Sequence, residues 1–297
     1  MKKILFYVTK LIEKLFHKKL VFINKNSFSL NLGLTAVKSK FNFWYVGNVF
    51  DSADIAFGIV NNGLVEKEET ELVEKIIKNL LPEKNITFYD IGANTGYYGI
   101  LAACLDKQKI TTYSFEPIME FANCIKESAK INHLDNINIF NIALGNENIT
   151  KEIQLAGSGS SLNPKFNDNE KLPKQKITVK KLDDIIKINN INHPDFIKID
   201  VEGYEYEVLQ GSLDTIKKSL PILFIEIAYS LKNLNRNFIN QNYKKTFELL
   251  DSLGYRVYRL ANNTLEPFKA DNNPDGVHMY LFLHNNHQTI LNNLLIK

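Results

Sequence analysis

The chain has 297 residues, of which 44% are hydrophobic and 11% aromatic, enough for the core of one α/β domain with additions. Its net charge of +3 is too small to indicate a nucleic-acid partner. Its two cysteines, Cys104 and Cys124, fall in segments predicted to be core helices. We therefore expect free thiols in a reducing, cytoplasmic compartment.

Residues 1–20 predict a basic amphipathic helix. Residues 1–25 contain seven lysines and one glutamate, and the apolar side chains among them fall on one helical face. Because charges interrupt the apolar run, neither a signal peptide nor a membrane span is predicted. Such a helix either makes a peripheral contact with an anionic membrane, or packs on its own domain or on a second copy in a homodimer.

The pattern predicts two regions. Residues 1–65 form an N-terminal extension, in which short strands and an aromatic cluster at 41–45 follow the basic helix. Residues 66–297 form the main domain, which opens with a helix over residues 65–81. Acidic residues fill the first turns of that helix, where its dipole favours them, and Pro82 follows its end.

From residue 86 onward, strands and helices alternate, which is typical of a parallel sheet with helices on both faces. The linker between the last two strands is about sixteen residues, too short for a helical crossover, so these two strands are expected to pair antiparallel. The predicted strands cover residues 86–91, 110–115, 137–143, 196–199, 222–228, 255–260 and 277–283, and the predicted helices cover residues 97–105, 118–132, 205–219 and 243–253. The sequence thus predicts an α/β fold with a mostly parallel seven-stranded sheet.

A long excursion, residues 147–194, interrupts this alternation. Its two ends, 149–156 and 177–186, predict two strands and a short helix. Between them lies a stretch rich in Gly, Ser, Asn and Lys. It is either a mobile surface loop or a lid over a substrate, and the sequence does not choose between the two.

The stretch from residue 85 to residue 99 predicts a nucleotide-binding turn. A buried strand ends near Asp90, then Gly92 and Gly96 precede a helix, so the backbone and the helix N-terminus can approach a ligand. A dinucleotide fingerprint would have glycine where Asn94 stands. The acid Asp90 suits a cation, such as the amino group of a nucleoside that carries an amino acid.

Four motifs together resemble the FkbM family of S-adenosylmethionine-dependent methyltransferases. They are DIGANTG at 90–96, SFEP at 114–117, NIALGN at 141–146 and DFIKIDVEGYE at 195–205. The resemblance covers roughly residues 51–283. It implies a Rossmann-like class I methyltransferase fold with a C-terminal antiparallel hairpin strand, S-adenosyl-L-methionine as cofactor, and O-methylation of a hydroxyl on a sugar, glycan or natural product.

The resemblance and the strand ends together give the predicted cofactor site. Glu116 ends the second strand and can accept both ribose hydroxyls, and Pro117 beside it is expected to pack on the adenine. The resemblance places Asn141 and the backbone of Ala143 at the adenine edge. The full set of predicted cofactor residues is Asp90, Gly92, Ala93, Asn94, Gly96, Glu116, Pro117, Asn141, Ala143 and Asp200.

Methyl transfer to a hydroxyl needs in-line positioning and a group that takes the proton. Asp200 and Glu202 close the fourth strand, and Glu226 is the only charge in the apolar fifth strand. His278 opens the last strand. We predict Asp200 and Glu226 as the main catalytic candidates, with Glu202 and His278 beside them. No zinc-ligand spacing is present, so no metal is predicted, and a carboxylate-bound magnesium stays an open alternative.

Two other functions fit parts of the pattern. An NAD(P)-dependent oxidoreductase is opposed by Asn94 and by the antiparallel hairpin. A non-catalytic nucleotide-binding module is opposed by the intact set of Asp90, Gly92, Gly96, Glu116 and Asp200.

Overall fold

The computed structural model describes residues 27–29, 34–48, 54–167, 169, 171–271 and 273–295. The predicted amphipathic helix of residues 1–20 lies outside these ranges. Contacts divide the chain into two units, Met1–Val65 and Glu66–Lys297. None of the helices in the described ranges is both long and apolar enough to cross a membrane.

In the residues that the structure describes, the first unit contains a small antiparallel sheet and one helix. The sheet order is β1-β2-β3, and the helix α2 begins where the carboxylate of Asp54 accepts a hydrogen bond from the N–H of Ala56 at 2.7 Å. Phe43 and Tyr45 of the predicted aromatic cluster are buried within this unit. The elements are β1 (Ser27–Ser29), β2 (Thr35–Lys38), β3 (Trp44–Gly47) and α2 (Ile55–Asn62).

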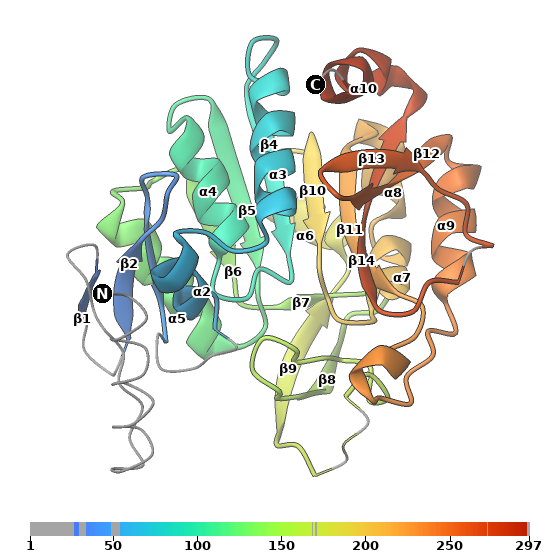
Figure 1. Ribbon diagram of the computed structural model, residues 1–297, viewed down its shortest axis with the longest axis horizontal. Helices are drawn as coiled ribbons and strands as arrows, with labels where there is room; N and C mark the ends of the chain where they lie inside the picture. Colours follow the sequence, from blue (N-terminus) through green and yellow to red (C-terminus); the bar gives the residue numbers. More distant parts are fainter. Residues whose placement is uncertain are drawn as a thin grey trace. The chain divides into compact units, whose positions relative to one another are not determined.

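The second unit is built on an eight-stranded sheet with the order β13-β12-β14-β11-β10-β4-β5-β6 (Figure 1). The five strands from β6 to β11 are parallel, and β14 runs antiparallel to both β11 and β12. The strands are β4 (Ile86–Ile91), β5 (Ile110–Phe115), β6 (Ile137–Phe140), β10 (Phe196–Ile199), β11 (Ile222–Ala228), β12 (Tyr255–Ala261), β13 (Thr264–Pro267) and β14 (Val277–His284). All seven predicted strands are therefore present, with the predicted antiparallel end.

Helices cover both faces of the sheet (Figure 1). In one layer α4 and α10 pack on α3, and α5 packs on α4; in the other, α6 packs on α8 and α7 on α9. The helices are α3 (Lys67–Leu80), α4 (Tyr97–Leu105), α5 (Met119–Ile131), α6 (Leu182–Asn189), α7 (Glu205–Gln210), α8 (Leu213–Ser219), α9 (Tyr243–Ser252) and α10 (Gln288–Leu295).

The alternation of side chains along β10 determines which of them lie on the same face of the sheet as Asp90. On β10, Ile197 and Ile199 join the core cluster that contains α6 to α9. Lys198 between them faces the α4 layer, where its ammonium lies over the ring of Tyr98. Lys198 pairs in register with Asp90 on β4, so both side chains lie on the same face of the sheet.

Three segments differ from the sequence prediction. The strand predicted over 137–143 ends at Phe140, and residues 143–144 form β7 of a second sheet, β7-β9-β8. The helix predicted over 205–219 breaks into α7 and α8, because the carboxylate of Asp183 on α6 accepts from the N–H of Thr215 at 2.8 Å and starts a new helix there. The second sheet comprises β7 (Ala143–Leu144), β8 (Ile149–Gln154) and β9 (Lys174–Lys180).

The third difference is the extra edge strand β13, which lies inside the predicted linker. Asn262 and Asn263 both have positive φ, 51° and 58°, and form the two-residue turn of a β12-β13 hairpin. Asparagine tolerates this conformation, which suits the twist of a hairpin.

Candidate active site

The glycine turn between β4 and α4 lies at the carboxyl end of the central strand β4, where several contacts fix it. Gly92 has φ 74°, and a Cβ there would lie 1.8 Å from the carbonyl oxygen of Asp200, so no side chain fits. The N–H groups of Gly92 and Ala93 donate to the carbonyl of Phe115 at 3.0 and 3.1 Å. The N–H of Gly96 donates to the carbonyl of Ala93 at 2.8 Å. These hydrogen bonds fix the turn that directly precedes the N-terminus of α4.

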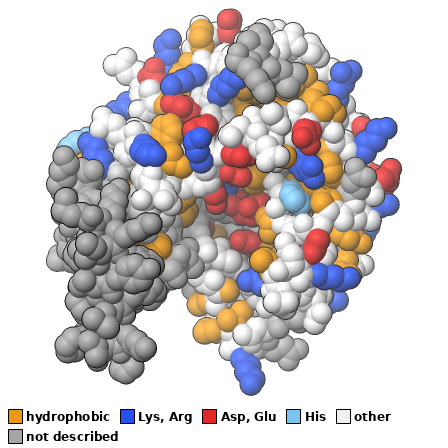
Figure 2. All heavy atoms as spheres, viewed as in Figure 1, with side chains coloured by type: hydrophobic (Ala, Val, Ile, Leu, Met, Phe, Trp, Pro, Cys, Tyr) orange, Lys and Arg blue, Asp and Glu red, His pale blue; other side chains and the backbone are white. Residues whose placement is uncertain are grey.

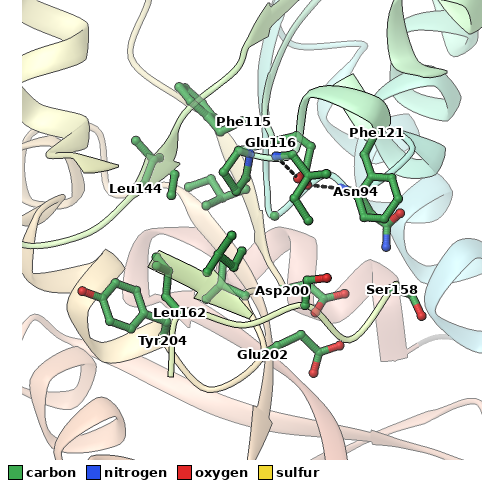
Figure 3. Close-up of a pocket in the computed structure, with 18 of the residues that line it drawn as sticks. Asn94, Phe115, Glu116, Phe121, Leu144, Ser158, Leu162, Asp200, Glu202 and Tyr204 are labelled. Atoms are coloured by element: carbon green, nitrogen blue, oxygen red, sulfur yellow. Dashed lines mark hydrogen bonds between the residues drawn. The ribbon is translucent and has the colours of Figure 1, made fainter. Parts of the chain in front are cut away.

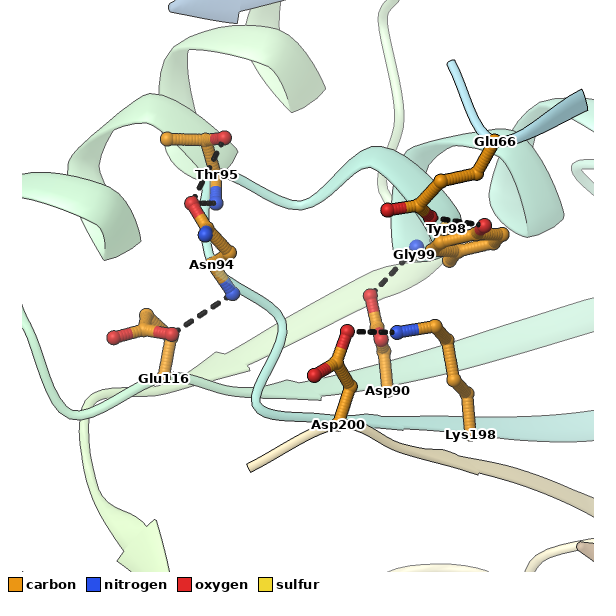
Figure 4. Close-up of polar contacts among 9 residues, drawn as sticks. All are labelled: Glu66, Asp90, Asn94, Thr95, Tyr98, Gly99, Glu116, Lys198 and Asp200. Carbon is orange, nitrogen blue, oxygen red and sulfur yellow. Dashed lines mark hydrogen bonds and ion pairs between the residues drawn. The ribbon is translucent and has the colours of Figure 1, made fainter. Parts of the chain in front are cut away.

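Glu116 follows β5 and is 4% exposed. Its Oε2 accepts from the N–H of Asn94 at 2.8 Å (Figure 4). Its Oε1 accepts from the N–H of Ile118 at 2.7 Å. Burial raises the pKa of Glu116 to about 8, although both hydrogen bonds favour the ionised form. Each oxygen keeps a second lone pair for a ligand. Asn141 donates its side-chain amide to the carbonyls of Glu116 and Pro117 at 2.9 and 3.0 Å, and so fixes this segment.

A cavity opens at the carboxyl ends of β4, β5 and β10, where open α/β sheets bind their ligands. Asn94 and Glu116 lie on one wall, and Asp200 and Glu202 lie on the opposite wall (Figure 3). The predicted cofactor residues that line it are Gly92, Asn94, Glu116, Pro117, Ala143 and Asp200. The others, Asp90, Ala93, Gly96 and Asn141, do not line it.

Asp90 lies beneath the cavity and is 1% exposed. Its Oδ2 accepts from the N–H of Gly99 in the first turn of α4 at 2.8 Å (Figure 4), while Oδ1 has no hydrogen-bond partner. Burial raises the pKa of Asp90 to about 6, and the ammonium of Lys198 opposes that rise. In this structure Asp90 holds the helix to the strand, and its contact with a ligand amino group stays a prediction.

Three predicted catalytic residues do come together. Asp200, Glu202 and Glu226 each place a carboxylate oxygen within 4.8 Å of the other two, and all three are partly exposed. Burial and the neighbouring carboxylates raise the pKa values of Glu202 and Glu226 well above their ordinary values. The space-filling view shows acidic side chains gathered in a hollow near the centre of one face (Figure 2). Because Mg²⁺ prefers carboxylate ligands, the open alternative of a bound magnesium refers to these three residues.

Lys198 supplies a buried cation beside Asp200. Its Nζ lies 2.9 Å from Oδ2 of Asp200 and 4.6 Å from the ring centroid of Tyr98, whose hydroxyl donates to Glu66 at 2.6 Å (Figure 4). Of the residues that the structure describes, Lys198 is the only buried lysine or arginine. Burial disfavours its charge, but attraction to Asp200 and Asp90 outweighs burial and raises the pKa of Lys198.

His278 does not join the carboxylates. Glu226 on β11 pairs with Met279 on β14, and His278 pairs with Ile227. His278 therefore faces the other side of the sheet, in the direction of Tyr280. Its Nε2 lies 3.0 Å from the carbonyl oxygen of Asp275. The prediction that His278 stands at the catalytic centre does not fit this arrangement.

Comparison with protein families shows to which family the chain belongs. Residues 90–257, more than half of the chain, match the family described as methyltransferase FkbM domain. The chain belongs to the FkbM family. It is a methyltransferase, and its methyl donor is S-adenosyl-L-methionine. The family assignment favours this interpretation over the NAD(P)-dependent oxidoreductase.

Solved structures with a similar fold are distant in sequence, and no curated protein matches the chain. The FkbM methyltransferase from Methylobacillus flagellatus has a TM-score of 0.41 and 18% identity, over 76% of this chain and 53% of that chain. TYW2 from M. jannaschii, in complex with AdoMet, has a TM-score of 0.40 and 13% identity, over 90% and 89%. The O-methyltransferase from Bacillus cereus, in complex with SAH, has a TM-score of 0.42 and 12% identity, over 71% and 79%.

The FkbM site also contains residues that sequence reasoning missed. Lys198 stands alone in an apolar strand, which is the signal that could have marked it. Tyr204 lines the cavity from within the motif at 195–205. Ser158 and Leu162 line it from the excursion, and no sequence pattern shows which of its residues turn inward.

Proposed function

We propose that this FkbM methyltransferase transfers the methyl group of S-adenosyl-L-methionine to a hydroxyl of a sugar, glycan or other small natural product. The observation that carries the proposal is the cluster of Asp200, Glu202 and Glu226 on the cavity wall opposite Glu116. A hydroxyl needs a group that takes its proton as the bond to the methyl carbon forms, and carboxylates also accept hydrogen bonds from neighbouring hydroxyls.

The two walls of the cavity have different roles in the proposed reaction. The wall with Asn94 and Glu116 binds the cofactor, and the wall with Asp200 and Glu202 binds the acceptor. Glu116 accepts hydrogen bonds from the ribose, and the turn at Gly92 and Asn94 lets the cofactor approach the backbone. On the other wall, the bound cofactor would supply its methyl group to the acceptor hydroxyl, and a carboxylate of the cluster would take the proton of that hydroxyl. Asp200, oriented by Lys198 at 2.9 Å, and Glu226 are the candidates for that step.

The test has two stages. Calorimetric titration with S-adenosylhomocysteine, with NAD as a control, measures the cofactor preference. Methyl transfer from tritiated S-adenosylmethionine to fractionated glycans and metabolites of a deletion strain then identifies the acceptor, and mass spectrometry locates the new methyl group. Label on oxygen supports the proposal. Label on nitrogen contradicts O-methylation, and cofactor binding without any transfer supports a non-catalytic module.

The cellular setting is part of the same proposal. We infer a cytoplasmic enzyme, because its two cysteines are free. We also infer that residues 1–20 touch an anionic membrane, their own domain or a second copy of the chain, because that segment is basic and amphipathic. Co-sedimentation with anionic and neutral vesicles, compared with a truncation that lacks residues 1–20, separates membrane contact from self-association.

A further inference from the structure

The excursion between β8 and β9 passes directly over the turn that carries Glu202. Its residue Ser161 is fixed by two backbone hydrogen bonds with Gln154 at the end of β8, at 3.0 and 3.2 Å, and is 1% exposed. Ser158 and Leu162, on either side of Ser161, line the same cavity as Glu202 (Figure 3). We call residues 157–167 the strap. The strap thus forms part of the cavity wall that contains Asp200 and Glu202, which we call the acceptor wall. A lid over the acceptor would lie in the same place.

The turn under the strap has an unusual backbone. Glu202 has φ 55° and Gly203 has φ 89°, so two successive residues are left-handed. Glycine adopts this conformation readily, but glutamate does so rarely and under strain. Strained residues persist where their surroundings hold them, and they concentrate at functional sites. Here the strain directs the Glu202 carboxylate to within 4.8 Å of the carboxylate oxygens of Asp200 and Glu226.

Hydrogen bonds from the strap hold both residues of the turn. The hydroxyl of Ser161 donates to the carbonyl of Glu202 at 2.5 Å and accepts from the N–H of Asn163 at 2.9 Å. The side-chain amide of Asn163 donates to the carbonyl of Gly203 at 3.1 Å. From below, the carboxylate of Glu205 accepts from the N–H of Gly203 at 2.7 Å. The polar backbone of the turn is therefore held from two sides.

Packing reinforces this contact. A Cβ on Gly203 would lie 2.8 Å from the ring of Phe166 on the strap and 3.2 Å from Phe238. The two rings pack edge to face with centroids 5.0 Å apart. The strap therefore lies on the turn with no room for another side chain, and a movement of the strap is a movement at Glu202.

We propose that Ser161 and Asn163 are positioning residues, which hold the Glu202 carboxylate beside Asp200 and Glu226 and thereby couple the acceptor wall to the cluster that takes the proton. The inference rests on the proposed function for its catalytic meaning. Neither residue touches a reacting atom. An acceptor that fits against Ser158 and Leu162 keeps the strap in place and so keeps Glu202 in position, whereas a poorly fitting one moves both.

The experiment compares Ser161→Ala, Asn163→Ala and their double variant with a matched control. The control is Asn167→Ala, because the amide of Asn167 donates to the carbonyl of Gly159 within the strap at 3.0 Å and does not touch the turn. Ser161→Thr is the conservative variant, since it keeps the hydroxyl. Thermal denaturation first shows which variants are folded, and all variants are expected to bind S-adenosylhomocysteine as the wild type does.

Two readouts then decide. In crystal structures with S-adenosylhomocysteine, we expect the double variant to relax Glu202 to negative φ and to move its carboxylate away from Glu226, whereas Asn167→Ala keeps both. In methyl transfer to the identified acceptor, we expect the double variant to lose about 10- to 100-fold in kcat, the range that displacement of a reacting group produces, and Ser161→Thr to recover most of it.

An unmoved Glu202 in the folded double variant, or an equal loss of kcat in Asn167→Ala, overturns the positioning role. The structural readout needs no acceptor. If the wild type methylates no hydroxyl, the proposed function fails, while the structures still show whether the strap positions Glu202.

Discussion

Replacing Glu116 tests the cofactor half of the site through its proton. In the free protein Glu116 is buried, and its pKa is raised to about 8. Ribose hydroxyls donate to a carboxylate, so the bound state favours the ionised form. Glu116 is then mostly protonated at neutral pH before binding and ionised after it. Binding of S-adenosylhomocysteine should therefore release a proton, and affinity should rise with pH until the pH exceeds the pKa of the free state.

The size of the effect follows from the ionised fraction. With a pKa of about 8 for Glu116, that fraction is about one hundredth at pH 6, one tenth at pH 7 and one half at pH 8. The association constant should thus increase about 50-fold from pH 6 to pH 8, and about 0.9 protons should leave per ligand at pH 7. The variant Glu116→Gln should bind about 1.5–3 kcal/mol more weakly at pH 8, as for a lost hydrogen bond to a charged group, with most of the pH dependence gone.

Calorimetry in phosphate and in Tris measures the proton release directly, because the two buffers differ in ionisation enthalpy. Glu205→Gln is the matched control. Glu205 is also buried with a pKa raised to about 8, but it does not line the cavity. It should keep the wild-type pH dependence of binding. Equal proton release in the wild type and in Glu116→Gln would refute the ribose role of Glu116.

Four further variants test other parts of the site. Gly92→Ala should abolish binding of S-adenosylhomocysteine and lower the melting temperature, since its Cβ would meet the carbonyl oxygen of Asp200 at 1.8 Å; calorimetry and thermal denaturation measure both effects. Lys198→Met should lower the free energy of unfolding by about 3 kcal/mol, the low end for a broken buried pair, whereas Lys84→Met, which breaks an exposed pair, should change it by at most about 1 kcal/mol in urea denaturation. Asp200→Asn should reduce turnover by ~10²–10⁴-fold while binding of S-adenosylhomocysteine is kept, as expected for a lost general base. Glu202→Gly should raise the free energy of unfolding by about 1 kcal/mol by relieving the left-handed strain, and should lower turnover; unchanged stability would argue against stored strain.

Apolar patterns made the sheet predictable. The buried strand at 222–228 is apolar apart from Glu226, and Glu116 directly follows the predicted strand at 110–115. The edge strand β13 has no such run, and only the Asn262-Asn263 pair marks its turn. The break between α7 and α8 depends on Asp183, which lies 32 residues away from Thr215, and a local pattern does not contain such a contact.

The facing of single side chains was harder to predict than the strands themselves. Glu226 and His278 lie on neighbouring antiparallel strands. A shift of one residue in their register would bring His278 to the face of the sheet on which Glu226 lies. The observed register pairs Glu226 with Met279, so His278 turns away from the cluster. Asp90 was correctly placed in its strand, but its partner is the helix N–H of Gly99, a contact that becomes visible only when α4 is packed on the sheet.

The two walls of the cavity differ in whether their residues favour or oppose folding. On the cofactor wall, the glycine turn and the bonds to Glu116 satisfy backbone groups, so each residue there serves folding as well as binding. On the acceptor wall, three carboxylates crowd together and Glu202 is left-handed, both of which oppose folding. The hydrogen bonds from the strap, the buried cation Lys198 and the charge of Arg236 offset this. Features that oppose folding and yet are held so firmly are expected at the site of chemistry, which supports the proposal that the reacting group of the acceptor lies on this wall.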